Sequence, residues 1–177
     1  MSKLRDEQIS AATTMAGLVD SELQASAITR VQCCARMAGT FLFRSYSHAL
    51  NPQAPGTVLR TPVAGQSGPA LVGMLDATLT RLGITVDSSR VDIEKLRDGQ
   101  DEIGFLTAQK ILEPLLTPVK EKYGLSYEEA AQACAVATAL LIKKEEKQLD
   151  AETAVSRAIY AFIEGSKTVP APLSAKH

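Results

Sequence analysis

The sequence predicts an all-α fold, a single-domain helical bundle of about five to seven helices. Apolar residues recur at spacings of three and four along most of the chain, as on one face of a helix. The chain has no tryptophan and 5% aromatic residues, while helix formers such as alanine, leucine and glutamate are abundant. Its 177 residues, 45% of them hydrophobic and 22% charged, are typical of one globular domain. We expect that domain to span residues 1–165, followed by a flexible tail, residues 166–177.

Two apolar seams lie in the N-terminal segment, residues 3–49. The step of five residues from Leu23 to Ile28 rotates the second seam relative to the first. Either one long helix changes its contact face there, or the chain breaks near Asp20, where a capping-box pattern favours a break. The segment either joins the bundle or extends from it as an arm. The seams consist of Ile9, Ala12, Ala16, Val19 and Leu23, and of Ile28, Val31, Ala35, Ala38, Leu42, Ser45 and Ala49.

A Pro/Gly-rich segment follows, residues 51–69, which contains four of the eight prolines. Proline lacks the backbone N–H and fixes its φ angle, so this segment is expected to be a crossover loop. The next helix is predicted at residues 69–82, because Pro69 suits its first position and Gly83 its end. A short helix is expected from Ser89 to Arg97.

A fourth helix is expected to begin near Asp101. Pro114 and Pro118 interrupt its apolar pattern. Each proline removes a helical hydrogen bond and clashes with the preceding turn, so we expect a kink or a break there.

The last two helices have the clearest start signals. Ser126 to Glu129 forms a capping box ahead of a helix predicted at residues 127–147. Asp150 is expected to cap a helix at residues 151–164, which Gly165 would end.

Charge and composition exclude several classes of partner. The net charge is −1, and neither half of the chain is basic, so nucleic-acid binding is not expected. The longest apolar run, residues 133–142, is about half the length of a membrane span, and no signal-peptide pattern opens the chain. Three cysteines, two of them adjacent, indicate free thiols in a reducing cytoplasm.

Motifs for catalysis or for a metal are missing from the sequence. The histidines are His48 and the terminal His177, and there is no Cys-x-x-Cys or Glu-x-x-His pair. Cys33 and Cys34 with Cys134 form a candidate soft-metal set, although buried structural thiols are the favoured interpretation. We therefore expect a protein without enzymatic activity, cofactor or metal.

One row of residues is unusual for a plain core. Arg30, Arg44 and His48 lie within about 60° of a common line on one helix, beside the second seam. They form either a boundary row with snorkelling arginine stems or a polar row that contacts a second subunit or an anionic ligand. The row also includes Cys33, Cys34, Met37 and Phe41.

A second candidate anion site is the turn from Gly65 through Ser67 and Gly68 to Pro69. Amides at the start of a helix bind anions, and this turn is expected to precede the helix at residues 69–82. It lacks the Gly-Lys-Ser/Thr ending of a phosphate loop, so a simple turn and cap is the favoured interpretation.

These observations favour a non-enzymatic interaction or regulatory protein that forms a homodimer through residues 3–49, because two displaced seams exceed what one bundle edge needs. A further protein partner is compatible with this function. The alternative is a helical bundle that binds a small anionic ligand at the Arg30, Arg44 and His48 row or at the Gly65–Pro69 turn.

Overall fold

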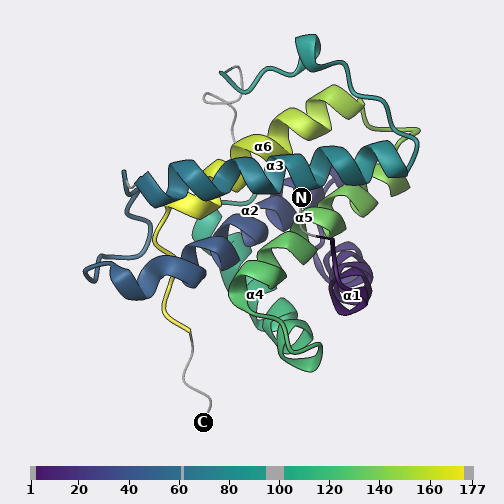
Figure 1. Ribbon diagram of the computed structural model, residues 1–177. Coiled ribbons are helices and arrows are strands. Elements are labelled where there is room, and N and C mark those ends of the chain that lie inside the picture. Colours follow the sequence, from purple (N-terminus) through teal and green to yellow (C-terminus); the bar gives the residue numbers. More distant parts are fainter. Residues whose placement is uncertain (1–2, 61, 95–101, 174–177) are drawn as a thin grey trace.

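Six α-helices make up the bundle in the part of the chain that the structure describes. The computed structural model describes residues 3–60, 62–94 and 102–173, and within these it contains helices and no β-strand (Figure 1). The all-α, single-domain bundle predicted from the sequence is thus confirmed. The helices are α1 (Asp6–Glu22), α2 (Ala27–Tyr46), α3 (Pro62–Arg81), α4 (Phe105–Lys122), α5 (Tyr127–Lys144) and α6 (Ala151–Lys167), with short 3₁₀ turns at Ser47–Ala49 and Ser88–Arg90.

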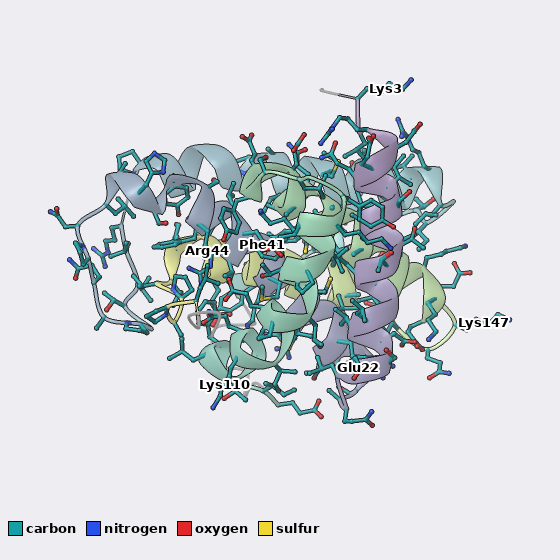
Figure 2. All side chains as sticks on the ribbon, turned by 90° about the horizontal axis from the view of Figure 1, so that it is seen from below. Lys3, Glu22, Phe41, Arg44, Lys110 and Lys147 are labelled. Carbon is teal, nitrogen blue, oxygen red and sulfur yellow. The ribbon has the colours of Figure 1, made fainter. Side chains whose placement is uncertain are left out.

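The helices form three layers, with α2 and α5 in the middle. α1 and α4 cover one side of this pair, and α3 and α6 cover the other (Figure 1). Most of α5 is buried all round, because its run of alanines lets neighbouring helices approach closely from several directions. Phe41 of α2 is fully buried between the layers, whereas Lys3, Lys110 and Lys147 lie at the periphery (Figure 2).

The N-terminal segment breaks into two helices that both belong to the bundle. The break spans Leu23 to Ser26, and the Ser26 hydroxyl caps α2 by accepting from the N–H of Thr29. The first seam packs α1 against α5 except at Ile9, which is 47% exposed, and most of the second seam lies at the centre of the molecule. The arm interpretation is therefore wrong, because α1 and α2 both pack against other helices of the same chain.

The predicted loop at residues 51–69 is too long. α3 begins at Pro62, so Pro62 occupies the first-turn position that we had assigned to Pro69. Pro69 lies inside the helix, which tolerates the lost hydrogen bond because Leu71, Leu75 and Leu79 bury its inner face.

The remaining boundaries also differ from expectation. Of the helix predicted from Ser89 to Arg97, the described part contains a 3₁₀ turn that ends at Arg90 and a 3₁₀ residue at Glu94, and residues 95–101 lie outside the described residues. α4 begins at Phe105 rather than near Asp101 and continues through Pro114 and Pro118 without a break. α5 ends at Lys144, three residues early, where the chain turns. The caps predicted at Ser126 and Asp150 are both present.

Gly165 does not end α6. It lies where α6 crosses α2, and a Cβ built on it would be 2.3 Å from the carbonyl oxygen of Arg36. The reciprocal Cβ on Gly39 would be 2.6 Å from the carbonyl oxygen of Phe162. The two glycines thus permit backbone contact between the helices, and α6 continues to Lys167.

The chain after α6 is fixed to the bundle as far as it is described, contrary to the expected tail from residue 166. Thr168 forms an antiparallel bridge with Val58, and Gly56 N–H donates to the carbonyl of Val169 at 2.7 Å. Ala171 is bound by α4, as set out below. Residues 174–177 lie outside the described part of the chain.

Candidate functional site

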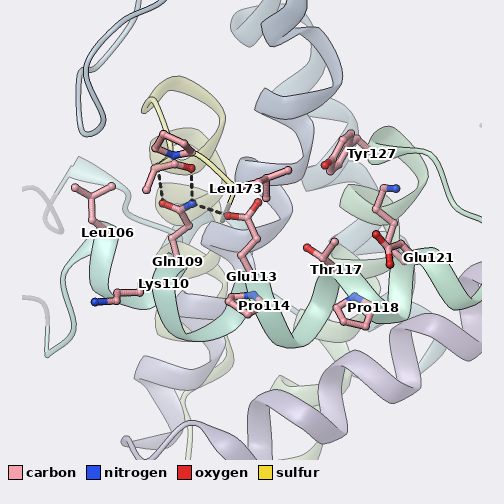
Figure 3. Close-up of a pocket in the computed structure, with 13 residues that line it drawn as sticks. Leu106, Gln109, Lys110, Glu113, Pro114, Thr117, Pro118, Glu121, Tyr127 and Leu173 are labelled. Atoms are coloured by element: carbon pink, nitrogen blue, oxygen red, sulfur yellow. Dashed lines mark hydrogen bonds between the residues drawn. The ribbon is translucent and has the colours of Figure 1, made fainter. Parts of the chain in front are cut away.

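A groove of about 660 Å³ runs along α4, between this helix, the start of α5 and the segment after α6 (Figure 3). Leu106 lies at one end, Glu121 and Tyr127 at the other, and Leu173 between them. Its lining residues are Leu106, Gln109, Lys110, Glu113, Pro114, Thr117, Pro118, Lys120, Glu121, Tyr127, Ala171, Pro172 and Leu173.

The walls of the groove are largely apolar. Leu106 and Leu173 remain 39% and 49% exposed, and Pro114 and Pro118 are exposed as well. The opposite face of α4 is buried in the core through Leu112 and Leu116. α4 is therefore apolar on two faces, one in the core and one facing solvent. An amphipathic helix at the surface of a monomer usually has a polar solvent-facing side.

A buried polar network forms the inner wall. Glu113, 4% exposed, accepts from Nε and Nη2 of Arg44, the Nη2–Oε2 distance being 3.0 Å, and from Nε2 of Gln109 at 2.5 Å. Such a bidentate pair with an additional donor satisfies the buried carboxylate. The network positions Arg44 of α2 against α4.

The same network holds the segment after α6 in place. The side-chain amide of Gln109 accepts from the Ala171 N–H at 2.8 Å and donates to its carbonyl at 3.1 Å (Figure 3). Arg44 Nη2 also donates to that carbonyl, at 2.8 Å. Within the groove wall formed by residues 171–173, the backbone of Ala171 is therefore held by side chains of two helices.

Lysines mark the rim. Lys120 Nζ lies 4.5 Å from the ring centroid of Tyr127, a cation–π distance, and Lys110 is exposed near the other end. The hydroxyl oxygen of Thr117 is buried and has no hydrogen-bond partner among the described residues. The groove thus combines apolar walls, two lysines and the carboxylates of Glu113 and Glu121, and the Thr117 hydroxyl is buried behind its lining.

The row of Arg30, Arg44 and His48 does not form one site. Arg30 lies at the other end of α2, where its guanidinium is 3.6 Å from Asp20 and 3.5 Å from Glu145. His48 is exposed in the 3₁₀ turn after α2. Residues 30 and 44 are about 21 Å apart along the helix axis, so a shared angular position does not bring them together. Of the three, Arg44 alone adjoins the groove.

The predicted anion site at Gly65, Ser67 and Gly68 is wrong in its location. These residues lie inside α3 rather than ahead of it, so the amides of Ser67 and Gly68 belong to the helix interior. The unpaired amides of a helix are confined to its first turn. The side chains of residues 63–67 are outside what the structure describes.

Sequence reasoning also missed Arg36, one of the largest fully buried side chains. It is 2% exposed, and it donates from Nε to Glu164 at 2.9 Å and from Nη1 to the carbonyl of Ile103 at 2.7 Å. Both partners are distant in sequence, so no local pattern could have indicated it. For the groove, the available signal was the pair Pro114 and Pro118 in an otherwise helical stretch.

The cysteines are buried and free. Burial raises the pKa of the Cys34 thiol to about 12 and raises that of Cys134 well above its ordinary value. The Cys134 sulfur contacts the Met15 sulfur at 3.5 Å. Within the described residues, no three side chains of His, Cys, Asp or Glu are grouped so that they could hold a metal ion.

We expect the thiols of the native protein to resist modification. A thiol whose pKa rises from 9.0 to about 12 has about a thousandfold less thiolate, the reactive form, at pH 8. Titration with an aromatic disulfide reagent should show Cys34 and Cys134 reacting only as the protein unfolds, and quickly in guanidinium chloride. Rapid reaction of Cys134 in the native state would show that it is accessible.

Comparison with protein-family models, curated proteins and solved structures finds no match for this chain, so its site is interpreted from its own geometry. In the described part of the chain, no helix combines the length and the apolar character that crossing a membrane requires.

Proposed function

We propose that this chain is a non-enzymatic binding protein whose groove along α4 holds an amphipathic ligand that carries an anionic group. The observation that carries this proposal is a half-open, apolar-walled groove of about 660 Å³ with a lysine near each end. Binding sites are concave and mostly apolar, with few polar groups that orient the ligand. An apolar body would cover Leu106 and Leu173, and an acidic group would meet Lys110 or Lys120.

The rigidity of the wall supports binding. Arg44, Glu113 and Gln109 satisfy one another and fix Ala171, so the groove exists before a ligand arrives. A preformed site loses less conformational entropy on binding. The same contacts occupy both oxygens of the Glu113 carboxylate with hydrogen bonds to Arg44 and Gln109. This supports a binding role for the groove over general acid–base chemistry.

The groove favours ligand binding over the homodimer expected from the N-terminal seams. Most of both seams is covered within one chain, with Ile9 as an exposed exception, so the pattern that predicted self-association has another explanation. Self-association through α1 stays a prediction, and its test is given in the Discussion. Three buried free cysteines support placing the protein in a reducing compartment such as the cytoplasm.

Leu173→Glu tests the groove with 1-anilinonaphthalene-8-sulfonate, a probe that joins an apolar body to one anion. The parent protein should bind the dye saturably. The variant should bind about tenfold more weakly, because it loses apolar contact and adds a like charge. Fluorescence titration measures the dissociation constants, and circular dichroism confirms cooperative unfolding.

Ile9→Glu is the matched control. Ile9 is 47% exposed on α1, close to the 49% of Leu173, but it does not line the groove. Its substitution should leave dye binding unchanged. Equal weakening in both variants, or no saturable binding by the parent, would contradict the proposed function.

A further inference from the structure

Two prolines alter the hydrogen bonding of α4 along the groove. In a regular helix the carbonyls of Lys110 and Pro114 would accept from the N–H groups at positions 114 and 118. Both of those positions are proline, which has no N–H. Lys110, Pro114 and Pro118 form one row along the helix (Figure 3), so the two carbonyls that lose their usual donors follow each other along the groove.

The prolines lie where water or a ligand can reach their row. Lys110, Pro114 and Pro118 are exposed, and all three line the groove. Interior prolines are strongly unfavourable in a helix relative to alanine. This side of the groove therefore contains two carbonyls without their usual helical donors, which favours a ligand with N–H groups.

The spacing of these acceptors matches an extended polypeptide. The carbonyls of Lys110 and Pro114 are four residues apart, about 6 Å along the helix axis. In an extended strand, N–H groups on one edge recur every second residue, about 6.6 Å apart. From Leu106 to Glu121 the groove follows about 22 Å of helix, the length of about seven extended residues.

The charges and walls indicate which side chains such a peptide would carry. Lys110 and Lys120 are about 15 Å apart along α4, close to the 13 Å between residues four apart in a strand. Acidic side chains at that interval would meet the two lysines. Because side chains alternate along a strand, apolar residues between them would face Leu106 and Leu173.

We propose that the ligand is an extended peptide segment of about seven residues, with alternating apolar and acidic side chains, which donates backbone N–H groups to the carbonyls of Lys110 and Pro114. This inference rests on the proposed function, because it names the ligand class of the same groove. It differs from peptide addition to a sheet edge in that the acceptor edge belongs to a proline-interrupted helix.

The first test uses the peptide fluorescein-Leu-Glu-Leu-Thr-Leu-Glu-Leu-amide, labelled at its N-terminus. Two N-methylated versions block opposite edges of the strand, one at the leucine amides and one at the glutamate and threonine amides. Fluorescence anisotropy should show saturable binding of the parent peptide. One methylated version should bind about tenfold or more weakly, since about two hydrogen bonds are lost, and the other should bind within about threefold.

The second test is Pro114→Ala, which restores an N–H donor for the carbonyl of Lys110. The variant should melt about 6–12 °C higher, because the helix regains a hydrogen bond. It should also bind the peptide about fivefold or more weakly, because the ligand loses an acceptor. A proline with only a structural role would not couple higher stability to weaker binding. Dye binding, which needs no N–H donor, should change less than peptide binding.

The outcomes separate the two proposals. Dye binding that depends on Leu173, combined with no saturable peptide binding, would overturn the peptide inference and leave a small amphipathic anion as the ligand. Equal effects of both methylation patterns, or unchanged peptide binding by Pro114→Ala, would likewise overturn backbone recognition. Failure of the Leu173→Glu test would instead overturn the proposed function itself.

Discussion

Gly165→Ala is expected to destabilise the protein by about 3 kcal/mol or more, because the new methyl group has no space. Its Cβ would lie 2.3 Å from the carbonyl oxygen of Arg36 and 3.0 Å from the Cα of Gly39. Both are backbone atoms of α2, so no side-chain rotation can relieve the clash, and the helices must separate. Chemical denaturation followed by circular dichroism measures the loss in free energy of unfolding.

Separation of α2 and α6 would also change the geometry of the groove. The Tyr46 hydroxyl donates to the carbonyl of Ser166, and the chain beyond α6 carries Ala171 to Gln109 and Arg44. A shift of α6 therefore moves one wall of the groove. We expect dye binding by the folded fraction of the variant to weaken together with its stability.

Gly17→Ala is the matched control, a change of the same kind within a helix. A Cβ on Gly17 would have no atom within 4 Å apart from its own helix and its chain neighbours, so α1 can accept it. Alanine is favoured over glycine in a helix by about 0.5–1 kcal/mol, so this variant should be slightly more stable. A Gly165→Ala protein as stable as the parent would contradict the close helix crossing.

Gly165 also shows where sequence reasoning about the fold stops. Helix starts could be predicted at Ser126 and Asp150, because a cap and its acceptor lie within three residues of each other. A glycine near a helix end can be there for either of two reasons. It can adopt the left-handed conformation that ends the helix, or it can allow another helix to cross closely. The sequence does not distinguish these two reasons, because the second depends on the position of the neighbouring helix.

The prolines are a second example. Proline penalises a helix locally, but burial of the opposite face can outweigh that penalty, as it does in α4. A local rule therefore predicts a break at Pro114 and Pro118 where packing maintains a helix. The two prolines are the signal in the sequence that this face of α4 is unusual, but the segments that complete the groove, the start of α5 and residues 171–173, are not indicated by it.

The site was predictable only in part, because the residues that form its hydrogen bonds with one another are far apart in the sequence. Arg44 was identified as unusual beside an apolar seam, but Glu113 lies 69 positions away, and Gln109 and Ala171 are 62 positions apart. Periodicity places Arg44 on a helix face and cannot choose its partner. A shared angle on a helix likewise placed Arg30 and His48 in the row with Arg44, although they occupy different surroundings.

Deletion of residues 1–20 is expected to abolish cooperative unfolding. The lost segment includes Ala12, Met15 and Val19, all fully buried, and burial of the larger side chains contributes about 1.5–3 kcal/mol each. The deletion would also remove two ion pairs at the ends of α1, which are Arg5–Glu129 at 2.8 Å and Asp20–Lys144. The sum is comparable with the whole stability of an ordinary domain, about 5–15 kcal/mol.

The same deletion decides between a monomer core and a dimer surface. If α1 completes the core, thermal unfolding of the truncated chain lacks a sharp transition at every concentration. If α1 is instead a dimer surface, the truncated chain stays folded while sedimentation shows that a full-length dimer has become a monomer. Ile9→Glu separates the two without removing the helix, because this exposed residue would break a dimer through α1 but leave the core intact. We expect Ile9→Glu to change neither the sedimentation coefficient nor the melting temperature, since the apolar side of α1 is covered by α5.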